Sequence, residues 1–159
     1  MKRFIFSVLT IGLILGLSGC SSSPKDSLQS SVDEYKECTI NWDAECIAKF
    51  SDPSLVKLSG GINKFSKNLE KDMKKAKDSM NISIKINDIG KISQNNNILK
   101  SNIIMTQTME ILDEKMQEVL GKKMEQKDSM IAISTDDGKN WYFTNKASQA
   151  LTKELQGMQ

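Results

Sequence analysis

The hydrophobic pattern changes its period near residue 80, and this change constrains the fold more than any other feature of the sequence. Before it, apolar residues recur three or four positions apart, as on one face of a helix: Ile62, Phe65, Leu69, Met73, Ala76 and Met80. After it, Ile82, Ile84 and Ile86 alternate with polar residues, as in a strand with one buried face. Helices followed by strands predict an α+β domain, with three N-terminal helices packed on a curved antiparallel sheet.

The other two helices are expected before Ile62. Residues spaced by four, three and three positions form the apolar side of the first: Leu28, Val32, Tyr35 and Cys38. The second follows Asp43, a suitable N-cap, and ends near Pro53, because proline disfavours a helical conformation for the residue before it. A short apolar turn is expected to follow, with Leu55, Val56 and Leu58. Lysines on the polar face of the 62–80 helix are expected to face solvent, with contact to anionic lipid head groups as the alternative.

Later strands are predicted at residues 103–111, 130–135 and 141–143, with a turn at 95–97. Gln107 is the polar exception on the apolar face of the 103–111 strand. Residues 113–127 fit either a helical stripe or a hairpin that turns at Gly121, and the hairpin is preferred because both flanks are strands. On these strands, Glu110 and Glu118 are expected to point outward.

The tight turn between the last two strands carries a spaced motif, Ser134, Asp136, Gly138 and Trp141. It resembles the Asp-box of sialidases and related β-propellers, in which the aspartate folds back onto the turn backbone. The motif occurs once, and the sequence has no propeller-like repeat of roughly 40 residues. We therefore interpret it as a structural turn rather than a sugar-binding site.

The N-terminus has the pattern of a lipoprotein signal peptide over residues 1–19. Lys2 and Arg3 precede an apolar stretch that is shorter than a membrane span and ends in Leu17-Ser18-Gly19-Cys20. This ending resembles the lipobox of bacterial lipoprotein precursors. The resemblance implies a diacylglycerol on the Cys20 sulfur and an acyl chain such as palmitate on the new amino terminus. An ordinary cleaved signal with an incidental cysteine is the alternative.

Residues 20–26 are then expected to be the lipidated cysteine and a short polar tether. Ser21 after the cysteine resembles precursors that are sorted to the outer membrane. The expected location is therefore the cell envelope, with the protein anchored in the outer membrane and facing the periplasm.

Cys38 and Cys46 are predicted to form a disulfide, because an exported domain folds in an oxidising compartment. Two free buried thiols are the first alternative. A reactive redox pair is the second, and it is disfavoured because the spacing is not C-x-x-C.

The absence of histidine from the chain excludes Ser-His-Asp and Cys-His catalysis and histidine-ligated metals. Neither glycine-rich phosphate-binding motif is present, and two cysteines alone do not complete a zinc site. We expect no metal, and no cofactor apart from the lipid on Cys20. Without Lys2 and Arg3, the chain has 20 basic and 20 acidic residues, so its charge gives no reason to expect a nucleic-acid partner.

The order of elements over residues 27–145 resembles the nuclear-transport-factor-like superfamily, the cone-shaped fold of ketosteroid isomerases and many exported bacterial proteins. The turn at 53–61, the 62–80 helix and the Gly-x-x-Trp-Tyr-Phe strand look like uncharacterised lipoproteins of that group. The resemblance implies a pocket between sheet and helices. The Asp-plus-Tyr pattern of the isomerases matches no positions, so no catalytic residue carries over.

These observations predict a membrane-anchored protein that is not an enzyme. Its domain is expected to bind a small apolar molecule, a peptide or a partner protein through the pocket or the sheet concavity. The alternative is an envelope assembly protein that docks through its helices or a sheet edge, and a third reading is a pocket enzyme with close, buried carboxylates. Residues 146–159 are expected to form a C-terminal tail with a short, weakly amphipathic helix.

Overall fold

The computed structural model describes residues 23–145 and residue 149. The predicted signal peptide, the lipidated Cys20 and nearly all of the 146–159 tail lie outside the described residues. The elements are α1 (Pro24–Ile40), α2 (Ala44–Lys49), α3 (Pro53–Leu58), α4 (Ile62–Ser79), β1 (Met80–Ile89), β2 (Ser93–Asn95), β3 (Ile98–Ile111), α5 (Glu114–Leu120), β4 (Lys123–Ser134) and β5 (Tyr142–Thr144).

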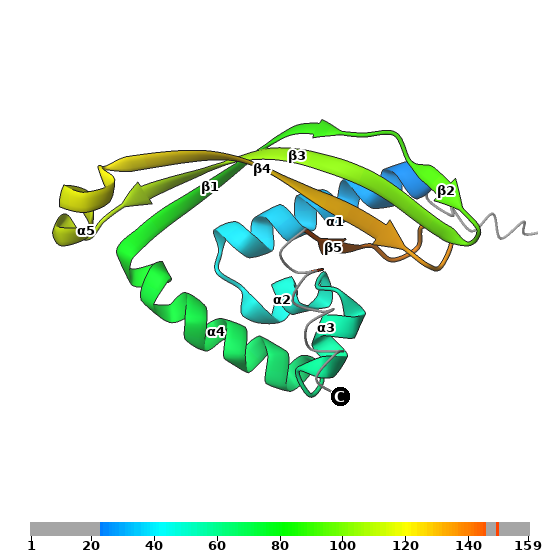
Figure 1. Ribbon diagram of the computed structural model, residues 1–159, viewed down its shortest axis with the longest axis horizontal. Coiled ribbons are helices and arrows are strands. Elements are labelled where there is room, and N and C mark those ends of the chain that lie inside the picture. Colours follow the sequence, from blue (N-terminus) through cyan, green and yellow to red (C-terminus); the bar gives the residue numbers. More distant parts are fainter. Residues whose placement is uncertain (1–22, 146–148, 150–159) are drawn as a thin grey trace, which may run out of the picture.

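The strands form one five-stranded antiparallel sheet, in which β1, β3, β4 and β5 are neighbours in that order and β2 pairs with β3. The helices α1 to α4 lie on the same side of this curved sheet (Figure 1). Both the predicted α+β class and the switch from helix to strand at residue 80 are confirmed. Because β1, β3 and β4 pair in register, Ile84, Gln107 and Gln126 form one row across the sheet.

The core lies between α1 and the sheet. Leu28 and Val32 of α1 are fully buried, as are Ile103 of β3 and Ala132 of β4. The alternation within each strand explains this packing, since successive side chains point to opposite faces of a sheet.

The first helix begins earlier than the sequence predicted. The Ser23 hydroxyl accepts a hydrogen bond from the Asp26 N–H at 3.2 Å, and Pro24 occupies the first helical turn, where no N–H partner is needed. Residues 24–26 therefore belong to α1 rather than to the predicted tether. The predicted cap of the second helix is confirmed, because the Asp43 carboxylate accepts from the Cys46 N–H at 2.9 Å.

The segment predicted as an apolar turn is the short helix α3, so four helices precede the sheet in the described chain. The Asp52 carboxylate caps it by accepting from the Ser54 N–H at 2.8 Å, and Pro53 is its first residue. An N-cap aspartate followed by proline is a helix-start signal that the prediction overlooked.

The preferred strand hairpin at residues 113–127 is wrong in part, because α5 occupies its first half. Asp113 caps this helix by accepting from the Met116 N–H at 2.9 Å, and Gly121 ends it with a φ of 80°. Glu118 is therefore an exposed helical residue, not a strand residue, whereas Glu110 is exposed on β3 as predicted. The strand β4 begins after α5, at Lys123, seven residues before the predicted start at Met130.

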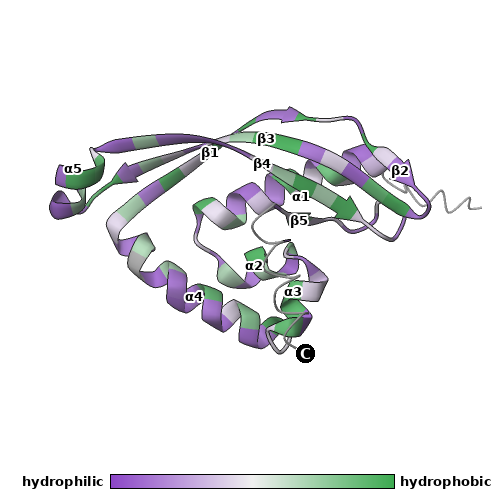
Figure 2. Cartoon of the chain, viewed as in Figure 1, coloured by the Kyte–Doolittle hydropathy of each residue, from purple (hydrophilic) through white to green (hydrophobic). Residues whose placement is uncertain are grey.

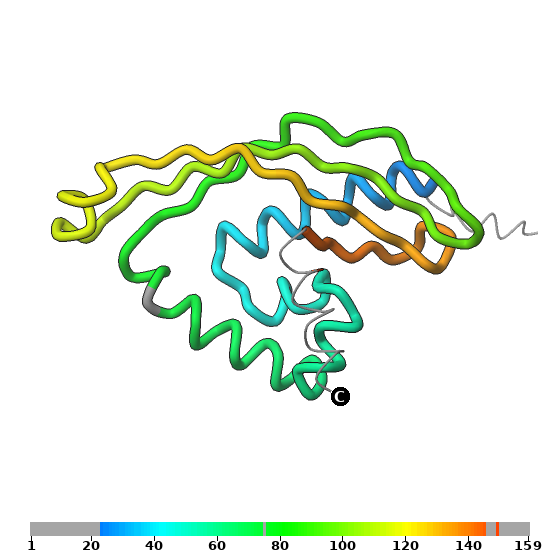
Figure 3. The backbone as a smooth tube through the Cα atoms, in the orientation of Figure 1, coloured from blue at the N-terminus to red at the C-terminus, as the bar shows by residue number. Residues whose placement is uncertain are grey.

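Together β3 and β4 form a long hairpin whose α5 end runs past the helices in this view (Figure 3). We call residues 105–128 of this hairpin, which include α5, the arm. Hydrophilic and hydrophobic residues alternate along it and along α4 (Figure 2). On α4, Lys64, Lys67, Lys71, Lys74 and Lys77 are exposed, which confirms the predicted solvated face.

Candidate functional site

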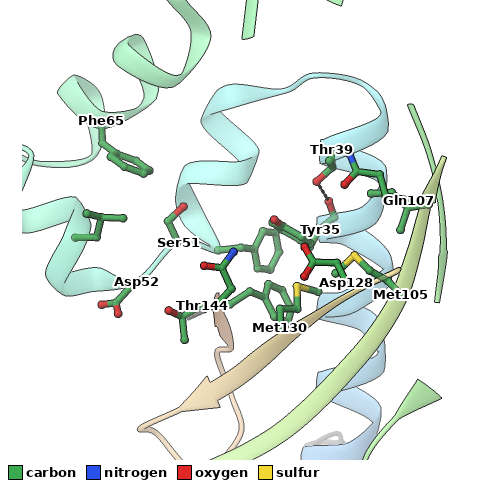
Figure 4. Close-up of a pocket in the computed structure, with 15 residues that line it drawn as sticks. Tyr35, Thr39, Ser51, Asp52, Phe65, Met105, Gln107, Asp128, Met130 and Thr144 are labelled. Atoms are coloured by element: carbon green, nitrogen blue, oxygen red, sulfur yellow. Dashed lines mark hydrogen bonds between the residues drawn. The ribbon is translucent and has the colours of Figure 1, made fainter. Parts of the chain in front are cut away.

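A pocket of about 200 Å³ lies between the second half of α1, the α2–α3 connection and the concave face of the sheet (Figure 4). Its lining residues come from segments that are distant in sequence, from Tyr35 on α1 to Thr144 on β5. An apolar cavity of about 150 Å³ is large enough for benzene. The pocket therefore fits a small organic molecule.

Three aromatic rings form one wall of the pocket. Tyr35 lies 4.9 Å from Phe143 and 6.0 Å from Phe50, and the Phe50 and Phe143 rings are 5.7 Å apart, all measured between centroids. Such tilted and edge-to-face arrangements are the ones that aromatic quadrupoles favour. The wall is fixed by packing and offers a preformed apolar surface.

The strands β1, β3 and β4 line the pocket with both apolar and polar side chains. Ile84, Met105 and Met130 are buried there, beside Gln107 and Asp128. Gln107 is the polar exception that the sequence singled out on β3, and the structure places it at the pocket. Met105 lies opposite Asp128 in the β3–β4 register, so the sulfur and the carboxylate come from neighbouring strands.

Tyr35 carries the ionisable group of the aromatic wall. Burial raises the pKa of its hydroxyl, a hydrogen bond with Thr39 lowers it, and the charge of Asp128 raises it again. The net effect is an increase above the ordinary value of 10. Tyr35 is therefore protonated at neutral pH and can donate a hydrogen bond to a bound molecule.

Thr144 contributes a buried hydroxyl group to the lining of the pocket. Its side chain is 4% exposed, and its hydroxyl has no hydrogen-bond partner among the described residues. A buried hydroxyl without a partner costs free energy, so such a group at a pocket wall favours a ligand that can pair with it. By contrast, Ser51 at the pocket donates its hydroxyl to the Ile47 carbonyl at 3.0 Å.

Asp128 is one of the site residues that sequence reasoning missed. Extending the alternation of Met130, Ala132 and Ser134 backwards along β4 would have placed Asp128 on the same inward face. The structure thus brings an aspartate next to Tyr35, although no Asp-plus-Tyr pattern was recognised in the sequence. The Asp128 side chain is exposed to solvent at the edge of the pocket.

The predicted disulfide between Cys38 and Cys46 is present and joins the end of α1 to α2, with 5.7 Å between the two Cα atoms. It follows Tyr35 by one turn and precedes Phe50, so it connects the two segments that carry the aromatic wall. Among the described residues, no cluster of cysteine and acidic side chains could hold a metal ion.

The turn motif lies outside this pocket, at the start of α1. The Ser134 hydroxyl donates to Asp136 at 2.8 Å and accepts from the Gly138 N–H at 3.0 Å. Hydrogen bonds from the Asn140 backbone N–H and side chain lower the pKa of Asp136 to about 2. Trp141 is buried in the core. In the structure these four residues shape and pack a hairpin turn.

Comparisons with protein-family models and with curated proteins found no match. Several solved structures are similar in fold, and two of them are described here. One is a nuclear transport factor 2-like superfamily protein from Salmonella enterica serovar Typhimurium, with a TM-score of 0.53 and 11% identity over 76% of this chain and 85% of that chain. The other is a dehydratase candidate of the same family from Streptomyces avermitilis, with a TM-score of 0.50 and 11% identity over 76% and 91%.

At this level of identity the comparison bears on the fold alone. The element order and the curved sheet agree with that similarity. The chain therefore has the nuclear-transport-factor-like α+β fold.

Proposed function

We propose that this chain is a lipid-anchored protein of the bacterial envelope whose pocket binds a small molecule without transforming it. The observation that carries the proposal is the pocket itself, with its rigid wall of Tyr35, Phe50 and Phe143 and the unpaired hydroxyl of Thr144. Ligand sites are commonly concave and mainly apolar, with a few polar groups that fix orientation. The described pocket is concave and combines an aromatic wall with several polar side chains.

Binding is favoured over catalysis by the chemistry of the polar groups. General acid–base catalysis works best with a group whose pKa lies near the operating pH, but the pKa of Tyr35 is raised further from neutrality. The second group, Asp128, is solvent-exposed, and the chain has no histidine. The dehydratase description of one structural neighbour applies to that protein. Tyr35 is better suited to donate a fixed hydrogen bond than to move a proton.

The lipobox-like ending at Cys20 supports the anchor. Because α1 begins at Pro24, only residues 21–23 separate Cys20 from the helix, and three residues reach at most about 10 Å. Among the described residues, no helix is both long and apolar enough to span a membrane. We therefore place the domain directly at the bilayer surface, and Ser21 favours the outer membrane.

The anchor is tested by membrane fractionation of the full chain and its Cys20→Ala variant. We expect the wild-type chain in the membrane fraction and the variant in the soluble fraction, with incorporation of labelled palmitate only in the former. A double Cys38→Ala/Cys46→Ala variant, which keeps Cys20, is the matched control and should remain in the membrane fraction. A Cys20→Ala chain that still floats with vesicles would exclude the lipid anchor.

The pocket is tested by native mass spectrometry of the protein extracted gently from envelopes. We expect a retained small molecule in the wild-type spectrum and its loss from Gln107→Trp, which fills the pocket. Val119→Trp is the control, because Val119 is 82% exposed on α5. An adduct that survives in Gln107→Trp would place the ligand elsewhere, and a bare wild-type protein would refute small-molecule binding.

The end of the arm favours a second function, docking to another envelope protein. Leu112, Val119 and Leu120 are 48%, 82% and 44% exposed there, and exposed apolar groups gathered at one site are typical of interaction surfaces. Cross-linking in intact envelopes from a residue at this end should give a discrete adduct that Val119→Asp/Leu120→Asp removes. An unchanged pattern in that variant would exclude docking through α5.

A further inference from the structure

We propose that the ligand of the pocket is a small organic cation, such as a quaternary ammonium or a protonated amine. This inference rests on the proposed binding function and names the chemical class that the pocket selects. It combines three features of the described lining: its charge, its aromatic rings and the unpaired Thr144 hydroxyl.

The charge of the lining is negative on both sides. Asp52, the N-cap of α3, lies on one side and Asp128 of β4 on the other, and no lysine or arginine is among the described residues that line the pocket. Neither carboxylate forms an ion pair within the described part of the chain. Each carboxylate also acts on a tyrosine. Burial is the main cause of the raised pKa of Tyr35 and of Tyr142, and the Asp128 charge raises the first further while the Asp52 charge raises the second. A cation that enters the pocket therefore gains attraction from two unneutralised charges.

The aromatic rings favour the same class of ligand. Tyr35, Phe50 and Phe143 lie together on one wall, and Phe65 of α4 lines the pocket from another side (Figure 4). The faces of aromatic rings carry negative potential, and they attract ammonium groups most strongly where water is excluded. A neutral apolar ligand would use the rings but would gain nothing from the carboxylates.

The Thr144 hydroxyl specifies a polar substituent on that cation. It is buried and has no partner among the described residues, so a hydroxyl or N–H on the ligand would complete its hydrogen bonding. A phosphate on the same ligand would be unfavourable, because it would meet two carboxylates and no cationic side chain of the described lining. The chemistry therefore favours a free cation over a phospholipid head group.

The test uses choline and its neutral carbon isostere dimethylbutanol, which differ in charge but hardly in shape. Binding of each to the full chain in detergent is measured by calorimetry at neutral pH. We expect choline to bind at least about tenfold more tightly than dimethylbutanol. Phosphocholine, the probe for a head group, should bind more weakly than choline. Phosphocholine that binds as tightly as choline would overturn the preference for a free cation.

Asp128→Asn should weaken choline binding by roughly three- to tenfold and leave dimethylbutanol binding unchanged. Asp72→Asn is the matched control, because Asp72 is exposed on α4 and outside the pocket lining. It changes the net charge equally and should alter neither affinity. An equal loss in both variants would mean that the attraction is not local to the pocket and would overturn the proposal.

Two further outcomes separate this inference from the proposed function. If dimethylbutanol binds as tightly as choline, the pocket binds ligands but does not select cations. If neither compound binds, the cation proposal fails, and the native mass spectrum then decides by itself whether the pocket holds a small molecule.

Discussion

The backbone N–H of Phe143 donates to the carbonyl of Phe50 at 2.7 Å, and the two rings lie 5.7 Å apart. The hydrogen bond belongs to an isolated parallel bridge between Ser51 and Phe143, so β5 is attached to the α2–α3 connection by backbone as well as by side chains. Because both segments line the pocket, this pairing holds two parts of the aromatic wall in place.

Phe143→Ala should lower the free energy of unfolding by about 3–5 kcal/mol, because it removes a buried ring that contacts both Tyr35 and Phe50. Urea denaturation followed by circular dichroism measures the change. Val119→Ala on the exposed face of α5 should change it by less than about 0.5 kcal/mol. A similar loss in both variants would contradict the central position of Phe143.

Removal of the disulfide by Cys38→Ala/Cys46→Ala should destabilise the fold by about 2–3 kcal/mol, because the bridge closes a short loop and restricts the unfolded chain. Denaturant titration of the variant and of the wild type gives the difference. Alkylation under denaturing conditions, followed by peptide mass analysis, should leave both residues unmodified in the wild type. Alkylation of both would show that the bridge is absent.

Thr144→Val should raise the free energy of unfolding by about 1 kcal/mol, because it replaces a buried hydroxyl that lacks a described partner with a methyl group of the same size. Ser101→Ala provides the contrast. The Ser101 hydroxyl is also buried, but it donates to the Gly90 carbonyl at 2.7 Å, so its removal should cost about 1 kcal/mol. Thermal and urea denaturation would show opposite signs, and a loss of stability in Thr144→Val would mean that its hydroxyl is paired.

Asp136 should make the stability depend on pH in the acid range. Its pKa falls from 3.8 to about 2 on folding, so the ionised carboxylate stabilises the turn above about pH 5, and most of this stabilisation is lost as the pH falls to 2. Since the side chain is partly exposed, we expect about 1 kcal/mol. Asp136→Asn should therefore be less stable than the wild type at neutral pH, and the difference should shrink on acidification.

The control for this pH dependence is Asp137→Asn at the neighbouring position. Asp137 has a φ of 58°, a conformation that asparagine also tolerates. Denaturation midpoints of the three proteins at several pH values give the comparison. An Asp136→Asn difference that stays constant between pH 7 and 2 would contradict the lowered pKa.

The parts of the fold that sequence predicted are those that local patterns determine. The stripe from Ile62 to Met80 and the alternation from Ile82 are backbone periodicities, and both match α4 and β1 apart from Met80 itself, which begins the strand. The short helix α3 was predicted as a turn, and a hairpin was preferred to the helical alternative at α5, although Asp52 and Asp113 cap these helices. With six and seven residues, they are too short for periodicity to distinguish a helix from a turn or strand.

The candidate site depends on contacts that sequence patterns do not contain. Gln107 was recognisable as a polar residue on an apolar face, but Asp128 lay beyond the predicted start of its strand. The approach of Asp128 to Tyr35 requires the β3–β4 register and the position of α1 on the sheet. The missing partner of Thr144 likewise follows only from three-dimensional packing.

Gly138 lies against the first residue of α1. It has a φ of 83°, and a Cβ atom there would come within 2.7 Å of the Pro24 side chain, while the Ser27 hydroxyl donates to the neighbouring Lys139 carbonyl at 3.4 Å. Pro24 therefore packs tightly against the turn that joins β4 and β5 of the sheet. Mechanical load applied through the residues before Ser23 would pass into the sheet at this contact instead of peeling α1 away from its N-terminal end.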